Sequence, residues 1–141
     1  MRPELNLFIK DRRSFVRPSG PTDCKIATVA EQPGRIEILK RKPLIGPAGQ
    51  LYDGCLQDAR LVRGDIYHTN VIKDLDLPLK SYIVAPYKKS PPHFTPIGQN
   101  YVDILQDELE KVSANVIIAM GNVAMFALTS RWGITLSLIH I

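Results

Sequence analysis

Hydrophobic and polar positions divide the chain into alternating strand-like and helix-like segments. Two of the three strand-like segments are short apolar runs, typical of strands buried on both faces of a parallel sheet. The helix-like segments have apolar residues three or four positions apart, so that these residues share one face. The predicted strands cover residues 25–30, 66–72 and 115–120, and the predicted helices cover 48–60, 96–112 and 123–131. This order predicts an α/β fold, a three-layer αβα sandwich with a central parallel sheet.

The remaining segments are rich in loop-forming residues. Residues 1–23 are basic, and we interpret them as an arm or a short helix that leads into a domain spanning 24–134. Residues 31–47 are predicted to form a long loop. The proline-rich residues 73–95 form a second one, whose length is typical of functional or disordered loops. Residues 135–141 form a short apolar tail, for which a non-native origin is one interpretation.

Composition limits the classes of function. The 141 residues suit one domain, and a net charge of +4 is compatible with DNA as a partner, although many unrelated proteins share such basicity. Cys24 and Cys55 form no C-x-x-C motif, which argues against a zinc or iron–sulfur site built from cysteine. We therefore expect no metal and no cofactor. No apolar run is long enough to span a membrane, so no membrane partner is expected.

Three polar or glycine-rich turns follow the predicted strands. They contain Glu31-Gln32-Pro33-Gly34, Asn70 and Gly121-Asn122. In open parallel sheets, ligands bind outside the carboxyl ends of the strands, where turns of this kind meet. The sequence therefore predicts a pocket at this edge of the sheet.

Asn70 carries the most specific chemistry of these turns. Its amide offers both a donor and an acceptor, which match the O4 acceptor and the N3–H donor of uracil. Cytosine presents the reverse pattern, so an amide in a fixed rotamer can discriminate between the two bases. The alternative is an asparagine that bonds to loop backbone at a strand end, and for Asn70 alone this is the more common case.

Two further turns carry groups that can contact a ligand. Pro33 stiffens the first turn and Gly34 allows close backbone approach, with the carboxylates of Glu31 and Glu37 within reach. A plain turn with exposed acids is the alternative. The segment Gly46-Pro47-Ala48-Gly49 precedes a predicted helix, and the NH groups at such a helix start can hold a phosphate. The segment matches neither the nucleotide-binding P-loop nor the dinucleotide-binding glycine motif.

Four motifs in order give the chain a family resemblance. They are Ala30-Glu31-Gln32-Pro33-Gly34, Pro43-Leu44-Ile45-Gly46-Pro47-Ala48-Gly49-Gln50, Tyr67-His68-Thr69-Asn70-Val71-Ile72-Lys73 and Val116-Ile117-Ile118-Ala119-Met120-Gly121-Asn122-Val123-Ala124. With these motifs the chain resembles the uracil-DNA glycosylase superfamily over about residues 24–134. The branches it resembles are the iron–sulfur enzymes and a phage DNA-polymerase-associated branch.

The resemblance implies an activity and assigns roles to residues. Uracil is flipped out of DNA into a pocket, and its N-glycosidic bond is hydrolysed. Asn70 then reads the uracil edge, Pro33 and Gly34 contact the base, and Leu44 lies against its ring. The resemblance implies catalytic roles for Glu31, Gln32 and Glu37, and DNA phosphate contacts for Gly46, Ala48, Gly49, Gly121 and Asn122. It implies uracil-containing DNA and a DNA polymerase as partners of a monomeric, cytoplasmic protein in a bacterial or phage-infected cell.

Several departures from the family pattern change this expectation. Leu44 replaces an aromatic residue, Ala30 replaces a glycine, and Gln32 stands where some branches have a water-activating aspartate. The cysteines of the iron–sulfur branch are absent, which favours the phage-associated branch. The family continues to a further strand and a His-Pro motif, whereas this chain ends in His140-Ile141. We therefore expect a domain missing its last strands. A catalytically weak or inactive DNA-binding or polymerase-accessory domain is the alternative function.

Overall fold

The structure of the protein is a computed structural model that describes residues 1–133. The expected tail at 135–141, including His140, lies outside the described residues. Among the residues that are described, no helix combines the length and hydrophobicity that a membrane span requires.

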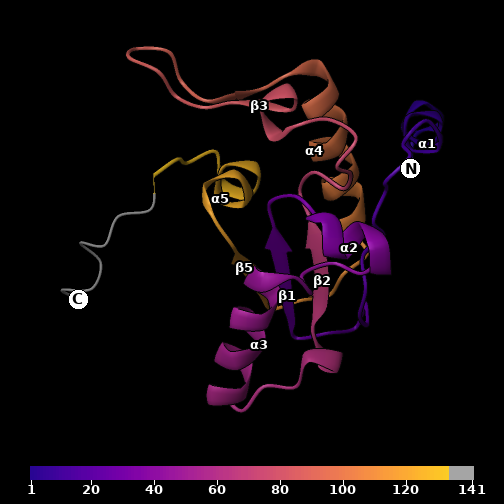
Figure 1. Ribbon diagram of the computed structural model, residues 1–141, viewed down its shortest axis with the longest axis vertical. Helices are drawn as coiled ribbons and strands as arrows, with labels where there is room; N and C mark the ends of the chain where they lie inside the picture. The colour runs from indigo at the N-terminus through magenta and orange to yellow at the C-terminus, as the bar shows by residue number, and fades with distance from the viewer. Residues whose placement is uncertain (134–141) are drawn as a thin grey trace.

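A three-stranded parallel sheet forms the centre of the molecule (Figure 1). Its strands are β1 (Ile26–Ala30), β2 (Tyr67–Asn70) and β5 (Val116–Ala119), in the order β2-β1-β5. All three predicted strands are thus confirmed. The central strand β1 is the most enclosed because it pairs with a neighbour on each side.

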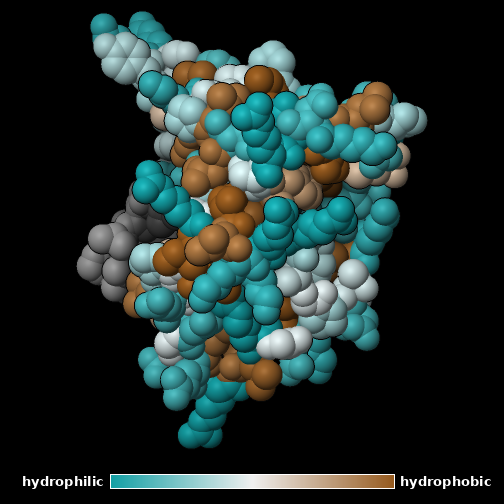
Figure 2. Space-filling model, turned by 45° about the vertical axis from the view of Figure 1, so that its right-hand side comes forward, coloured by the Kyte–Doolittle hydropathy of each residue, from teal (hydrophilic) through white to brown (hydrophobic). Residues whose placement is uncertain are grey.

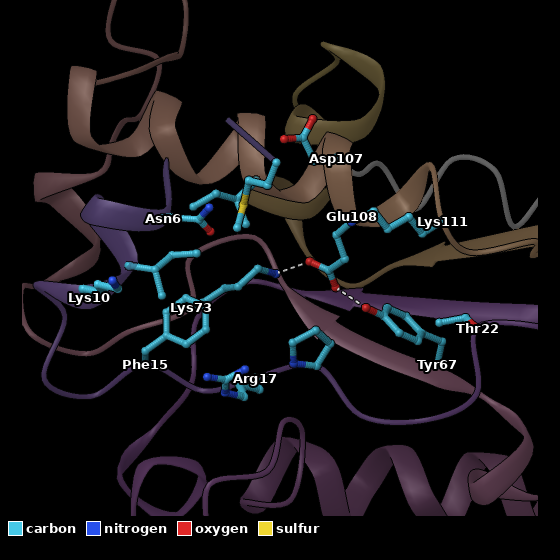
Figure 3. A pocket seen from close by; sticks show the side chains of 14 residues that line it. Asn6, Lys10, Phe15, Arg17, Thr22, Tyr67, Lys73, Asp107, Glu108 and Lys111 are labelled. Atoms are coloured by element: carbon cyan, nitrogen blue, oxygen red, sulfur yellow. Dashed lines mark hydrogen bonds and ion pairs between the residues drawn. The ribbon is translucent and has the colours of Figure 1, made fainter. Parts of the chain in front are cut away.

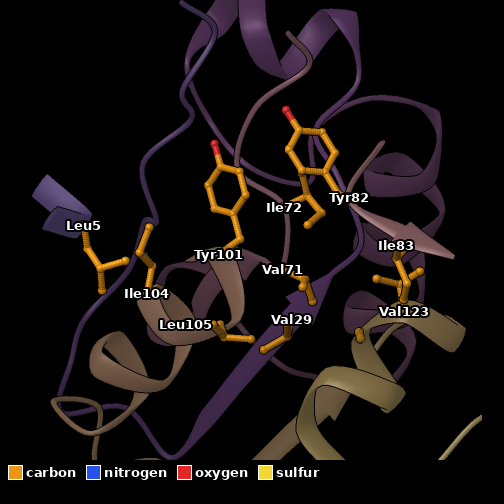
Figure 4. Close-up of a cluster of buried hydrophobic side chains, with 11 residues drawn as sticks. Leu5, Val29, Val71, Ile72, Tyr82, Ile83, Tyr101, Ile104, Leu105 and Val123 are labelled. Atoms are coloured by element: carbon orange, nitrogen blue, oxygen red, sulfur yellow. The ribbon is translucent and has the colours of Figure 1, made fainter. Parts of the chain in front are cut away.

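Helices cover both faces of the sheet, as the predicted αβα sandwich requires. The α3 helix (Pro47–Asp58) packs on the face of Ala30, where Tyr52 and Leu56 contribute to the core. The helices α4 (Pro96–Leu109) and α5 (Asn122–Thr129) pack on the face of Val29 (Figure 4). Neighbouring residues of a strand point to opposite faces. Val29 therefore packs against one helix layer and Ala30 against the other.

The segment before β1 is part of the folded core. It contains the α1 helix (Pro3–Lys10), whose Leu5 is buried against α4 beside Tyr101 and Ile104 (Figure 4). An ion pair of 2.9 Å between Arg2 and Asp103 adds a surface link between the same two helices.

Both predicted loops contain short regular elements. Residues 31–47 include the α2 helix (Arg35–Lys40), so the prediction of a continuous loop is wrong there. Six residues are too few for a clear helical periodicity, which is why the pattern does not show it. Residues 73–95 contain a 3-10 turn (Leu79–Ser81) and the antiparallel pair β3 (Ile83–Val84) and β4 (His93–Phe94), beyond which the loop projects from the body (Figure 1).

A buried carboxylate anchors the second of these loops. Asp74 is fully buried and accepts hydrogen bonds from the hydroxyl groups of Tyr82 and Tyr101. Burial and the neighbouring carboxylate raise the pKa of both tyrosines, so both remain hydrogen-bond donors. The network ties the beginning of the loop to α4.

The third strand differs from its prediction in its environment. Val116 and Ile117 are 55% and 43% exposed, although the apolar run predicts burial on both faces. Within residues 1–133, β5 pairs only with β1 and is an edge strand. Figure 2 shows that hydrophobic side chains also reach the surface elsewhere, in patches separated by polar residues.

Candidate functional site

The three strand ends meet as predicted. Strand register places Ala30 beside Asn70, and the backbone of Met120 donates to Val29 on the other side of β1. The turn after β5 approaches the turn after β1, because a Cβ atom on Gly121 would lie 3.9 Å from the Glu31 carboxylate. The structure thus brings Glu31, Asn70 and Gly121 to one edge of the sheet.

The Asn70 side chain points toward the α3 face. His68, two residues earlier on β2, bonds to Tyr52 of α3, and alternate residues of a strand share a face. Asn70 therefore lies on the same face as its neighbour Ala30. Ala30 packs in one cluster with Leu44, so Asn70 and Leu44 lie on the same side of the sheet.

The amide group of Asn70 has no hydrogen-bond partner within residues 1–133, although the residue is only 3% exposed. The fully buried side-chain atoms without a hydrogen bond belong instead to Arg12, Glu37 and Glu108, so the Asn70 amide retains some contact with solvent. A ligand that supplies both a donor and an acceptor can pair with both ends of this amide and displace that solvent.

Leu44 is fixed by unusual backbone geometry. It has a φ of 56°, which is left-handed and uncommon for a leucine. The guanidinium of Arg63 donates to the carbonyl oxygens of Pro43 and Leu44, at 2.9 and 2.7 Å. On the other side, a Cβ atom on Gly49 would lie 2.1 Å from the Leu44 carbonyl oxygen. Backbone strain held in place by its surroundings is common at binding sites.

No pattern in the sequence marks Arg63 as a site residue. It lies in a short 3-10 turn (Arg63–Asp65) before β2, and it also forms an ion pair of 2.6 Å with Asp53. None of the four motifs includes it. Only the fold brings this guanidinium to the Leu44 backbone.

In the turn after β1, Pro33 and Glu31 are shielded from solvent, whereas Gln32 bonds to the loop after β2. Pro33 is buried, and Glu31 is half-buried, which raises the pKa of its carboxyl group. The side-chain amide of Gln32 donates to the carbonyl oxygens of Asp74 and Leu77, at 2.9 and 3.1 Å. Gln32 therefore anchors the loop after β2, and its catalytic role remains a prediction.

Glu37 lies between two of the predicted glycine turns. A Cβ atom on Gly46 would lie 2.9 Å from both of its carboxylate oxygens, and one on Gly34 would lie 3.6 Å from the nearer oxygen. The Glu37 carboxylate therefore lies at the start of α3, where the helix dipole favours a negative charge. A DNA phosphate at this position would meet that charge, so the phosphate contacts predicted for Gly46, Ala48 and Gly49 gain no support.

The turn after β5 is hydrogen-bonded to the segment that follows α5. Gly121 has a φ of 91°, a conformation that favours glycine, and it precedes the first residue of α5. The Asn122 side chain accepts a hydrogen bond from the backbone of Gly133 at 3.2 Å. The DNA contacts of Gly121 and Asn122 remain predictions.

The described residues do not fit a metal or cluster cofactor. Cys24 is buried, whereas Cys55 is exposed on α3. In residues 1–133, no three His, Cys, Asp or Glu side chains lie close enough to hold a metal ion. Residues 1–133 therefore offer no set of ligands for the iron–sulfur cluster found in one branch of the family that the sequence resembles. The expectation of no cofactor stays a prediction.

Buried hydrogen bonds join α3 to β1 and β2 on the face of the sheet that also carries the Asn70 side chain. Tyr52 is bonded to Thr28 at 2.9 Å and to the Nε2 atom of His68 at 2.8 Å. Burial, with the nearby positive charge of Arg63, lowers the pKa of His68 to about 4. His68 is therefore neutral in the folded protein at pH 7.

We predict a pH-dependent loss of stability that comes from His68. The unfolded histidine titrates at its ordinary pKa, so between pH 6.5 and 4 the unfolded state binds more protons. The free energy of unfolding should thus be highest above pH 6.5 and fall below it by up to about 1.4 kcal/mol per pH unit. Urea denaturation at pH 7.5, 6.5 and 5.5 measures this slope. The control His68→Gln should flatten it, and equal slopes in both proteins would refute the assignment.

The amino-acid sequence matches one family model and several known proteins. The family model of the uracil DNA glycosylase superfamily matches residues 17–140. A type-4 uracil-DNA glycosylase of Archaeoglobus fulgidus is 34% identical over 116 residues, which are 82% of this chain and 52% of that protein. One of Thermotoga maritima is 29% identical over 116 residues, 82% of this chain and 54% of that protein. The chain thus spans about half the length of these relatives.

Proposed function

Because the chain belongs to the uracil-DNA glycosylase superfamily, we propose that it hydrolyses the N-glycosidic bond of uracil in DNA, with Asn70 as the residue that reads the base. The observation that carries this proposal is the Asn70 amide, nearly buried and without a partner in residues 1–133, at the meeting point of the strand ends. The uracil-DNA glycosylase names of the relatives support the substrate class.

Recognition follows from the chemistry of one amide. A uracil extruded from the base stack can accept from the Asn70 amide at O4 and donate to it from N3–H. Cytosine would place a donor against a donor and leave the buried groups unpaired, at about 1–3 kcal/mol for each. Leu44, held by Arg63, supplies an apolar surface on the same side of the sheet. Without an aromatic ring, this surface stacks on the base less strongly.

Bond cleavage requires charge stabilisation on both sides of the reacting bond. The C1′–N1 electrons pass to the uracil ring, the sugar becomes cation-like, and water then adds to C1′ and releases a proton. We assign the orientation of that water to the half-buried Glu31 carboxylate, which also stabilises the cationic sugar. Gln32 cannot accept the proton, and its amide is already engaged by the loop after β2.

Release of uracil from oligonucleotides tests the function. Single- and double-stranded DNA with one uracil should lose the base, whereas the same DNA with cytosine should not. Glu31→Gln should slow release by about 10-fold or more, because the water loses its acceptor and the sugar its counter-charge, with little change in DNA binding. Salt-sensitive DNA binding without any uracil release would contradict the proposal and favour the non-catalytic DNA-binding alternative.

Other expectations from the sequence stay predictions. They concern the DNA polymerase partner, the monomeric state, the cytoplasmic location and the domain boundary at residue 24.

A further inference from the structure

Three residues of the β2 motif have no role in the proposed chemistry. Tyr67, Thr69 and Lys73 belong to the same motif as Asn70 but lie on the opposite, α4 face of the sheet. Tyr67 and Lys73 border a cavity of about 660 Å³ between the amino-terminal segment, β2 and α4 (Figure 3). Figure 3 shows Lys73 and Tyr67 reaching Glu108 of α4 from two sides.

Lys73 is the centre of this cluster. It is only 1% exposed, and its ammonium group forms an ion pair of 2.7 Å with Glu108. It also donates to the Thr69 hydroxyl and to the backbone carbonyl of Asn70, each at 2.6 Å. Glu108 accepts a further hydrogen bond of 2.7 Å from the Tyr67 hydroxyl. The Lys73 ammonium is therefore directed to β2 and to Glu108, and the Glu108 oxygen nearest to it has that ion pair as its contact.

A buried ion pair of this kind contributes little to the free energy of unfolding. Burial lowers the pKa of Lys73 and Glu108 opposes this shift, so desolvation of the two charges offsets much of their attraction. An apolar pair of similar size would fill the same space at a similar free energy. What the charged pair adds at Asn70 is a hydrogen bond to the last carbonyl of β2, on the peptide whose N–H already donates to Ala30 within the sheet.

We propose that Lys73, held in place by Glu108, is a positioning residue that fixes the Asn70 peptide and thereby the direction of the Asn70 amide on the other face of the sheet. This inference rests on the proposed function of Asn70. Rotation of the Asn70 peptide would tilt its side chain away from the uracil edge. Misplacement of a binding group by about 1 Å can cost about 100-fold in rate.

The experiment uses the double variant Lys73→Met/Glu108→Gln, because it removes both buried charges together. Lys73→Met alone would leave the Glu108 carboxylate buried without its cation and endanger folding. Glu108→Gln alone removes the counter-charge of Lys73 but leaves Lys73 itself, the donor to the Asn70 carbonyl, in place. Lys111→Gln, an exposed residue at the rim of the same cavity, is the control outside the cluster.

Two readouts separate positioning from a merely structural role. We expect uracil release by the double variant to fall by about 10- to 100-fold in kcat, with KM for DNA changed less than about 3-fold. Its Asn70 side-chain amide resonances should broaden in the NMR spectrum without ligand. Glu108→Gln should show smaller effects of both kinds, and Lys111→Gln neither.

The result that would overturn the proposal is a double variant that equals Glu108→Gln in both readouts. If the unmodified protein releases no uracil, the proposed function fails. The comparison of Asn70 resonances then still decides the positioning role, since it needs no activity.

Discussion

Replacement of Asn70 by alanine is expected to lower kcat/KM for uracil release by about 100-fold or more, because both hydrogen bonds to the uracil edge are lost. The free energy of unfolding should change little, since the Asn70 amide forms no hydrogen bond within residues 1–133. Oligonucleotide assays and urea denaturation of the same preparation measure the two quantities. A buried asparagine with a structural role would show the reverse pattern.

The matched control for this prediction is Asn6→Ala. Asn6 is an exposed residue of α1 and lies at the cavity on the α4 face, away from the strand ends. Asn6→Ala should leave kcat/KM within a factor of two of that of the unmodified protein. Its free energy of unfolding should change little. The assignment of Asn70 is wrong if Asn70→Ala retains a third of the activity, or if it loses activity only in proportion to folded protein.

Gly49→Ala is expected to destabilise the protein by about 3 kcal/mol, because the added methyl group would lie 2.1 Å from the Leu44 carbonyl oxygen. That oxygen is also bound by Arg63, so the backbone cannot move aside without losing this hydrogen bond. The midpoint of urea denaturation should fall accordingly. Uracil release should fall further than the loss of folded protein explains, because Leu44 shifts.

Gly54→Ala, in the same helix, is the control. Nothing lies within 4 Å of a Cβ atom at Gly54, so alanine should stabilise α3 by about 0.5–1 kcal/mol. If the two variants have the same midpoint, the close approach of α3 to Leu44 does not constrain the turn.

The periodic parts of the fold are those that sequence patterns could predict. Strands β1 and β5 are apolar runs, β2 lies in a segment with apolar ends, α3 and α4 have a regular apolar face, and α5 is mostly apolar, so their order gives the sandwich. The short α2 helix shows no such pattern. The exposure of β5 depends on what lies beside the strand, which its own residues do not encode.

The candidate site was predictable only in part for a similar reason. Strand ends of a parallel sheet must meet, which brings Glu31 to Asn70. The contacts that orient them join residues far apart in the chain, such as Arg63 with Leu44 and Glu108 with Lys73. No local pattern marks such pairs, since each partner alone is an ordinary charged residue.

The central claim is that the carboxyl edge of the sheet binds one pyrimidine through Asn70. Its most direct test is a titration of the ¹⁵N-labelled protein with free uracil and, separately, with cytosine. Uracil should shift the Asn70 side-chain amide resonances in a saturable way, and cytosine should not. Unchanged Asn70 resonances, or equal shifts with both bases, would contradict the account.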